Sequence, residues 1–454
     1  MNQIERRAVF SLAGIFGLRM FGLFMLLPVL AIHTAGMPGS TPLKVGIALG
    51  AYGLTQALLQ IPFGLLSDRL GRKKLITTGL LIFILGSIVA AAASSIEWII
   101  AGRAIQGAGA ISSVILALTA DLTREEQRTK AMAIIGMSIG VVFLLSITLA
   151  PPLAEGIGVQ GLFILTGILA VLAIIVLHTV VPSPDSNFLH RDVVPVWSQI
   201  SVIARNPQLL QLDFGIFVLH LVLTALFVVI PGQLVTAFDI ALAEHWKIYL
   251  PIIVLSVAGM VPLIMISSRK GRAISAFRFA IAILSVGLAA LALSVVRTEG
   301  GLPVLLVSLW LFFVGFNALE AMLPSLVSRV APAAAKGTAI GIYNSCQFAG
   351  VFAGGMMAGF ITEHFGTDIV FWLCGLLCLC WLLLAVISGG FQLFSSRVLY
   401  IGEQSLLQTE ALVDRIRQVR GVKEVTIVRG ESLAYLKVDD KELDTAALHQ
   451  LKQT

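Results

Sequence analysis

The sequence predicts an all-α membrane protein with twelve transmembrane helices in two pseudo-symmetric six-helix bundles, followed by a small α+β domain. Three observations lead to this fold class. Of the 454 residues, 57% are hydrophobic and only 12% are charged, whereas about a quarter of the residues in water-soluble domains are charged. Apolar runs about long enough to cross a bilayer alternate with short polar loops. The segment from Arg397 onward is a different, charged kind of sequence.

The apolar runs define the expected spans. Helices are expected because lipid offers no partner for unpaired backbone groups. An even number of spans returns the C-terminus to the side of the N-terminus. We expect the spans at residues 8–33, 43–65, 75–95, 97–119, 131–153, 160–181, 209–236, 246–267, 273–296, 302–326, 337–361 and 367–388.

The loop Gly64–Lys74 sets the orientation of the chain. It has four cationic residues within six positions, and the runs on either side, Val45–Phe63 and Leu75–Ala93, have no charged residue. Short basic loops face the cytoplasm under the positive-inside rule, so both termini are predicted to be cytoplasmic. The net charge of +6 follows this alternation of loops. We therefore expect the lipid bilayer, and no nucleic acid, as the partner of the basic residues.

A polar, proline-containing break divides the spans six and six. The predicted domains are an N-terminal bundle at 1–181, a cytoplasmic linker at 182–208, a C-terminal bundle at 209–388 and a soluble domain at 389–454.

The two halves resemble each other in sequence. Pro62–Arg72 aligns with Pro262–Arg272, and the start of the fifth span at Lys130 aligns with the start of the eleventh at Lys336. Repeated halves of six spans are an architecture of secondary transporters.

Three motifs carry a resemblance to a known family. Gly64-x-x-x-Asp68-Arg69-x-Gly71-Arg72-Lys73 resembles the signature loop of the major facilitator superfamily, and Arg103–Gly109 is similar to its fourth-span motif. Gly136–Gly140 with Pro151 resembles the fifth-span motif of drug:proton antiporters, although Ala150 stands where that motif has glycine.

The resemblance covers residues 1–390 and implies a non-enzymatic transporter of the cell inner membrane. It implies proton-coupled efflux of drug-like or amphipathic small molecules by alternating access, driven by the proton gradient with no cofactor. A metabolite or sugar symporter or uniporter is the alternative within transport. A membrane sensor with a ligand-binding C-terminal domain is the alternative from another class. The sequence has no Gly-x-x-x-x-Gly-Lys-Ser/Thr loop, so no built-in ATPase is expected.

The signature loop predicts a cytoplasmic gate at Asp68. Its carboxylate is expected to bind the N-terminus of the eleventh span, where free N–H groups and the helix dipole favour an anion. The alternative is a weak surface pair with Arg69 or Arg72. Ser268 occupies the matching position in the second half, so the gate is expected on one side only. The gating motif comprises Gly64, Asp68, Arg69, Gly71, Arg72 and Lys73, with Asp121, Gly337, Thr338 and Ala339 as partners.

Three charged residues inside spans are candidates for proton coupling. Arg19 and Arg103 lie where an unpaired charge costs at least a few kcal/mol, so each is expected to have a partner; in relatives, the arginine matching Arg103 is implicated in proton coupling. Glu320 is the first choice for the protonatable group, with a permanent ion pair to Arg19 or Arg103 as the alternative. Asp213 is a weaker candidate because it is nearer the membrane surface.

Five polar side chains lie in otherwise apolar spans. They are expected either to line a substrate cavity or to join helices by hydrogen bonds, and the sequence does not distinguish these two roles. These residues are Gln56, Gln60, Asn317, Asn344 and Gln347.

The tail is predicted to fold as strand, helix, strand, strand and helix, at 398–401, 405–419, 422–428, 433–438 and 441–452. This is a ferredoxin-like order without its last strand. Gly421–Val425 resembles heavy-metal-associated domains, but the chain lacks their cysteine pair, so no metal is expected. A regulatory contact with the transporter or self-association is the predicted role.

Overall fold

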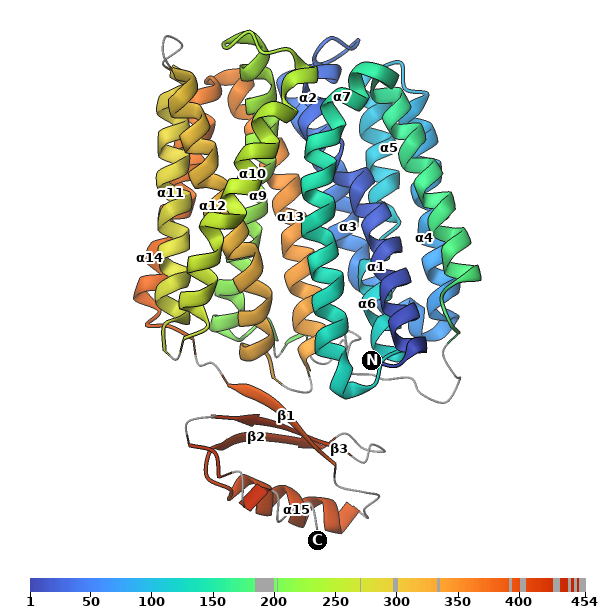
Figure 1. The fold of residues 1–454 in the computed structure, drawn as a ribbon, viewed down its shortest axis with the longest axis vertical. Helices are drawn as coiled ribbons and strands as arrows, with labels where there is room; N and C mark the ends of the chain where they lie inside the picture. Colours follow the sequence, from blue (N-terminus) through green and yellow to red (C-terminus); the bar gives the residue numbers. More distant parts are fainter. Residues whose placement is uncertain are drawn as a thin grey trace.

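The computed structural model describes residues 1–183, 200–201, 203–269, 271–296, 301–332, 335–391, 394–400, 406–427, 433–439, 442–444 and 447–448. Figure 1 shows an upright helical bundle with a small α+β domain beneath it. The first half contains α1 (Gln3–Phe24), α2 (Leu27–Ala35), α3 (Pro42–Leu70), α4 (Arg72–Ala91), α5 (Ile96–Ala108), α6 (Ser112–Asp121) and α7 (Glu125–Thr179). The second half contains α9 (Pro207–Thr236), η2 (Leu242–Glu244), α10 (Trp246–Ser267), α11 (Ala273–Val296), α12 (Gly301–Val330), α13 (Lys336–His364) and α14 (Thr367–Ile387).

Eleven helices within the described residues are long and apolar enough to cross a membrane. The sequence predicted twelve, and the difference lies in α7. Its apolar part, Lys130–Thr179, is 50 residues long and contains non-helical backbone at Gly158, with φ 68° and ψ 171°. The chain turns there at the far end of the bundle (Figure 1). The predicted fifth and sixth spans are therefore the two arms of one kinked element.

Two predicted spans are interrupted. The first is broken at Met25–Leu26, between α1 and α2, and Pro28 lies in the first turn of the second piece. The fourth is broken between α5 and α6, at residues 109–111. A break frees backbone carbonyls from helical bonding, and that of Gly109 accepts a hydrogen bond from Arg19. Both predicted spans are present, since Gln3–Ala35 and Ile96–Asp121 are each long and apolar enough to cross a membrane, but each consists of two helices.

The bundle has two ends, defined here by what lies at each. The domain end carries the N-terminus, the α3–α4 loop and the α+β domain, and the far end carries the start of α3 and the end of α13 (Figure 1). The α3–α4 turn at the domain end depends on Gly71, whose φ is 93°. The aligned glycine of the second half, Gly271, also has a positive φ of 76°, which only glycine adopts readily. The repeat seen in sequence is thus also a repeat of turn geometry.

Toward the far end, α3 of the first half and α13 of the second are in backbone contact. A Cβ atom on Gly355 would lie 2.2 Å from the carbonyl oxygen of Gly46, and one on Gly359 would lie 2.4 Å from that of Pro42. The Leu43 N–H donates to Glu363 Oε2 at 2.9 Å. Small residues spaced four apart let membrane helices approach this closely. We call the contact of Gly46 and Gly50 with Phe352, Gly355 and Gly359 the far-end seal.

The C-terminal domain contains β1 (Ser395–Tyr400), α15 (Leu406–Arg417), β2 (Val422–Ile427) and β3 (Leu433–Val438). The strands form one antiparallel sheet in the order β1-β3-β2, with a register shift between Val422 and Glu424. Ile416, Ala434, Leu436 and Val438 lie in its apolar core. The predicted strands and first helix are present within a few residues. Most of the predicted second helix and most of the predicted linker lie outside the described residues.

Candidate functional site

The signature loop places one arginine between two acids at the domain end. The Arg72 Nε donates to Asp121 Oδ2 at 3.1 Å, and its Nη1 contacts both the Asp68 carboxylate and the hydroxyl of Ser67. The side chains of Arg72 and Asp121 are 4% and 3% exposed, whereas that of Asp68 is 33% exposed. Arg72 therefore neutralises a buried acid on α6 and a half-exposed acid on α3, and ties both to the start of α4.

The other loop residues have different positions. Gly64 is buried, Gly71 forms the turn, and Arg69 is exposed. The Lys73 Nζ donates to the carbonyl oxygen of Val181 at 2.6 Å, so this residue joins α4 to the end of α7. Asp68 was expected to bind three residues, which form the buried first turn of α13: Gly337, Thr338 and Ala339. This helix begins at the same end of the bundle as the loop (Figure 1).

Arg19 lies fully inside the first half and is held by neutral groups. It donates to Gln56 Oε1 at 2.6 Å, to Ser112 Oγ at 2.8 Å and to the Gly109 carbonyl oxygen at 2.8 Å. Gln56 in turn donates to Gln60 Oε1 at 2.7 Å. Both glutamines are completely buried, so in this structure they join helices by hydrogen bonds.

Arg103 is also buried among neutral groups. It donates to Gln106 Oε1 at 3.1 Å and to backbone carbonyl oxygens of α3. The Tyr52 ring lies between the two arginines, with its centroid 5.8 Å from Arg19 Cζ and 5.1 Å from Arg103 Cζ. Cation–π contact and neutral acceptors offset part of the cost of burying each charge. The expected partners exist, and none of those in the described residues is an acid.

Glu320 lies in the second half and is not paired with either arginine in the described part of the chain. Its Oε2 atom is buried without a hydrogen-bond partner there, 3.9 Å from His220 Nε2 of α9. The side chain as a whole is 37% exposed, so Glu320 combines a buried oxygen with a partly accessible carboxyl group. The alternative of a permanent ion pair with Arg19 or Arg103 is wrong for this structure.

The remaining polar residues of the second half lie on neighbouring helices. Asn317 Nδ2 donates to Ser256 Oγ of α10 at 2.9 Å, and Gln347 Nε2 lies 2.8 Å from His220 Nε2. Asn344 is half-buried, and Asp213, on α9, is 5% exposed. Tyr343 is within electrostatic range of both Glu320 and Asp213. The polar groups of this half thus gather around α9, α12 and α13.

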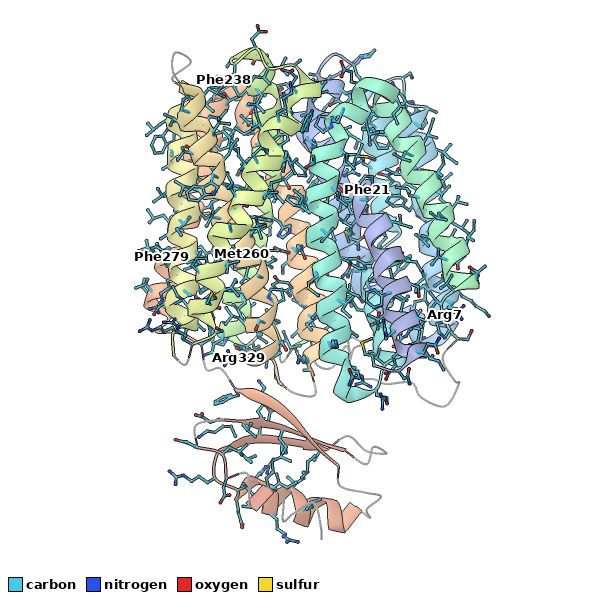
Figure 2. All side chains as sticks on the ribbon, viewed as in Figure 1. Arg7, Phe21, Phe238, Met260, Phe279 and Arg329 are labelled. Atoms are coloured by element: carbon cyan, nitrogen blue, oxygen red, sulfur yellow. The ribbon has the colours of Figure 1, made fainter. Side chains whose placement is uncertain are left out.

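The C-terminal domain contacts the bundle through a buried lysine. Lys437 of β3 is 4% exposed, and its Nζ donates to the carbonyl oxygens of Val330 at 2.6 Å and Arg329 at 3.4 Å. Figure 2 shows Arg329 at the end of α12, next to the sheet. Carbonyls at a helix C-terminus lack intrahelical partners and favour a cation. Burial lowers the pKa of Lys437; Glu424 opposes this shift and Lys336 adds to it.

A cavity of about 310 Å³ lies at this contact between the domain and the bundle. It is lined by Asn206, Gln208, Val330, Phe394, Lys423, Glu424 and Lys437. The domain therefore lies against the start of α9 and the end of α12.

The comparisons with known proteins agree with this geometry. The family model described as Major Facilitator Superfamily matches residues 12–355 and 281–390. The chain belongs to the major facilitator superfamily. As a member of this superfamily it is a multi-pass inner-membrane transporter of small molecules and not an enzyme, and the sensor alternative is set aside.

One relative matches almost the whole chain, and another matches most of it. It is 42% identical to the inner membrane transport protein YajR of Escherichia coli (strain K12), over 99% of this chain and 98% of that protein. The arrangement predicted from the sequence, twelve spans followed by a small α+β tail, also resembles that protein. A probable sugar efflux transporter of Mannheimia succiniciproducens is 24% identical over 81% of this chain and 89% of that protein.

A solved structure shares the fold. It is a bacterial homologue of the human lysosomal transporter Spinster, in an inward-facing and occupied conformation. It has a TM-score of 0.72 at 12% identity and covers 86% of this chain and 97% of that chain.

Sequence reasoning missed three features of the site. His220 is a lone histidine in an apolar span, and an ionisable residue inside a membrane span is itself a signal of function. The far-end seal has a Gly-x-x-x-Gly pattern on both helices, at Gly46 and Gly50 and at Gly355 and Gly359. Nothing in the sequence around Lys437 indicates that it is buried, because its burial depends on how the domain contacts the bundle.

Proposed function

We propose that this transporter is a proton-coupled exporter of amphipathic or drug-like small molecules that works by alternating access. The observation that carries the proposal is Glu320. It is an acid inside the second half, it has a buried oxygen without a hydrogen-bond partner in the described residues, and its side chain is partly accessible. Ionisable groups inside membrane proteins are costly and are typical of proton pathways. The arginines that would otherwise hold Glu320 permanently charged are engaged elsewhere.

Alternating access requires a closure at each end of the bundle. The far-end seal is formed in this structure. We propose that the second closure is at the domain end, where Asp68 binds the first turn of α13 at Gly337–Ala339. The N-terminus of a helix stabilises an anion there. Arg72 and Asp121 set the position of Asp68 for this gate. Since α3 and α13 take part in both closures, a tilt between the two helices opens one as it closes the other.

The domain end is proposed to face the cytoplasm, with both termini on that side. The basic loop Gly64–Lys74 supports this orientation through the positive-inside rule. The proposed units are the bundles 1–181 and 209–388, the linker 182–208 and the domain 389–454.

The tail is proposed to be a ferredoxin-like regulatory domain. The strand order β1-β3-β2, with α15 between β1 and β2, supports a split β-α-β arrangement. The contact of Lys437 with the end of α12 supports regulation through the bundle. Self-association through the same domain is the other proposed role.

A second candidate function is export of a sugar or related metabolite. It is favoured by the relative described as a probable sugar efflux transporter. The mechanism and the gate would be the same, and only the exported compound would differ.

An export screen tests the proposal. Metabolites and fluorescent amphipathic dyes are measured outside cells that overproduce the protein and cells that lack it, with and without a protonophore. Dye export that the protonophore abolishes is the expected result. Export of sugars alone would favour the second candidate, and export that persists without a proton gradient would contradict proton coupling.

A further inference from the structure

His220 is a buried ring on α9 whose tautomer is fixed by its surroundings. Its Nδ1 lies 3.3 Å from the carbonyl oxygen of Ile216. A carbonyl oxygen can only accept a hydrogen bond, so Nδ1 carries the hydrogen. In the neutral ring Nε2 therefore has a free lone pair.

Two side chains from different helices approach that lone pair. Gln347 Nε2 of α13 is 2.8 Å away and donates to it. Glu320 Oε2 of α12 is 3.9 Å away and has no hydrogen-bond partner in the described part of the chain. The Phe316 ring meets the imidazole edge-on, with centroids 5.9 Å apart, and excludes water from that side. His220 Nε2 thus has a donor on one side and an unused acceptor on the other.

Glu320 is the nearest charged group to the imidazole. The helix of His220 also carries Asp213, almost two turns earlier, and α13 contributes Tyr343 and Cys346. The other helices that pack against α9 have their charged residues toward their ends. These are Asp368 on α14, Glu244 on η2, and Lys44, Asp68 and Arg69 on α3, while α2 contributes His33.

We propose that His220 is a proton-binding site with Glu320 as its counter-ion and Gln347 as its link to α13. The proposal rests on the proton coupling proposed above. A proton that binds Nε2 occupies the lone pair, so the hydrogen bond from Gln347 is lost. The new N–H then donates to Glu320 Oε2, and the gap closes from 3.9 Å to about 2.8 Å, the length of a charge-assisted hydrogen bond.

Proton binding thereby transfers a contact from α13 to α12. α13 lies between α9 and α3, with Gly354 against the carbonyl oxygen of Leu221 on one side and Gly355 against that of Gly46 on the other. The helix released by His220 is thus the one that forms the far-end seal. Protonation of one ring nitrogen changes which helices are bound to each other, which is what coupling of a proton to a conformational change requires.

Nitrogen NMR of the full-length protein in lipid nanodiscs, with ¹⁵N-labelled histidine, tests the site without any substrate. The variant His220→Gln identifies the His220 resonance, and His178→Gln on the surface of α7 is the matched control. Glu320→Gln removes the group that stabilises the charged ring, and Gln347→Leu removes the donor that stabilises the neutral ring. We expect the His220 titration midpoint to move by about one pH unit or more in opposite directions in these two variants, and to be unchanged in His178→Gln.

The site is overturned if the His220 resonance does not titrate between pH 4 and 9, or if both neighbours shift it the same way or not at all. If His220→Gln does not fold, the resonance is assigned as the one that responds to both neighbouring variants. Proton flux into proteoliposomes is measured in parallel. A titrating His220 without flux would refute the proposed coupling and uphold the site, whereas flux with a His220 that does not titrate would refute the site alone.

Discussion

The candidate residues for proton coupling differ in sign between the two halves of the bundle. Arg19 and Arg103 are in the first half, with amide, hydroxyl, carbonyl and ring partners, whereas Glu320 and Asp213 are in the second. An arginine remains charged at any physiological pH, while a carboxyl group can exchange its proton. The first half therefore has arginines whose charge does not change, and the second half has the carboxyl groups that can gain or lose a proton. We propose that the second half carries the proton.

Asp68→Asn tests the gate. The amide has almost the shape of the carboxylate but not its charge, so the bonds to Arg72 and to the N-terminus of α13 weaken. We expect dye efflux to fall by more than tenfold while the amount of protein in the membrane stays the same, as measured by immunoblot of the membrane fraction.

The matched control for the gate variant is Lys74→Gln in the same loop. Lys74 is exposed at the start of α4, so its loss removes a charge without touching the gate. Wild-type efflux in Asp68→Asn, or equal losses in the two variants, would contradict the role of Asp68.

Single residues were predictable where a motif specifies a local geometry. The place of Asp121 beside the loop was predicted with the gating motif, whereas the positive φ of Gly71 appears only in the structure. The partners of Arg19 were not predictable, because one of them is a carbonyl oxygen freed by the break after α5. His220 was not predicted because its role depends on Glu320 and Gln347, which come from helices distant in the sequence.

Among the helices, α13 makes the contacts on which movement depends. It packs against α3 and α9, contributes Gln347 to the His220 site, and begins at the turn proposed to bind Asp68. Its glycines allow it to approach both neighbours at backbone distance. A larger side chain at these positions forces the helices apart.

Gly355→Val tests the far-end seal. The new side chain would occupy the position of the Gly46 carbonyl oxygen, 2.2 Å from the added Cβ, so α3 and α13 must separate. We expect the variant to lose at least about 1–3 kcal/mol of stability and the far end to become accessible to water. Thermal unfolding in detergent and thiol labelling of a cysteine placed at Ala48 measure the two effects.

Gly140→Ala provides the control for the seal, because nothing lies within 4 Å of a Cβ atom at that position. It should unfold and label like the wild type. Unchanged labelling in Gly355→Val would contradict the seal.

Lys437→Met tests the contact between the domain and the bundle. The substitution removes the donor to the carbonyl oxygens of Arg329 and Val330 and should weaken docking by about 1–3 kcal/mol. Limited proteolysis at the junction between α14 and β1 measures docking. Arg417→Met is the control, since Arg417 on α15 has an exposed side chain that pairs with Asp414; equal cleavage rates in the two variants would contradict the contact.

Docking in the wild type should also depend on pH. Because docking lowers the pKa of Lys437, the docked state binds fewer protons than the undocked state in the interval between the lowered value and the ordinary lysine pKa of about 10.4. Docking should therefore strengthen as the pH rises through that alkaline interval. Weaker docking with rising pH in that interval would contradict the assignment.

For the whole molecule, the repeat of six and six spans and the added domain were predictable from apolar periodicity and charge. The helix breaks after α1 and α5 were not, because their apolar sequence continues without interruption and the breaks depend on contacts with other helices. The sequence predicted a loop between the fifth and sixth spans, at 154–159. The structure has only a turn there, at Gly158 within α7.

Deletion of residues 397–454 tests the role of the domain. If the domain regulates transport through α12, the truncated protein should still insert and transport, at a rate that differs from the wild type by severalfold. Dye efflux and size-exclusion chromatography with light scattering measure rate and oligomeric state. An unchanged rate and an unchanged oligomeric state would contradict both proposed roles.

The central claim is that a proton exchanged at the pair of His220 and Glu320 drives transport, and proton flux in proteoliposomes tests it most directly. The purified full chain is reconstituted with a pH-sensitive dye inside, and flux is started by adding an exported compound found in the screen. The wild type should move protons in step with the compound, and Glu320→Gln should lose that proton movement while still binding the compound. Undiminished proton coupling in Glu320→Gln would contradict the account.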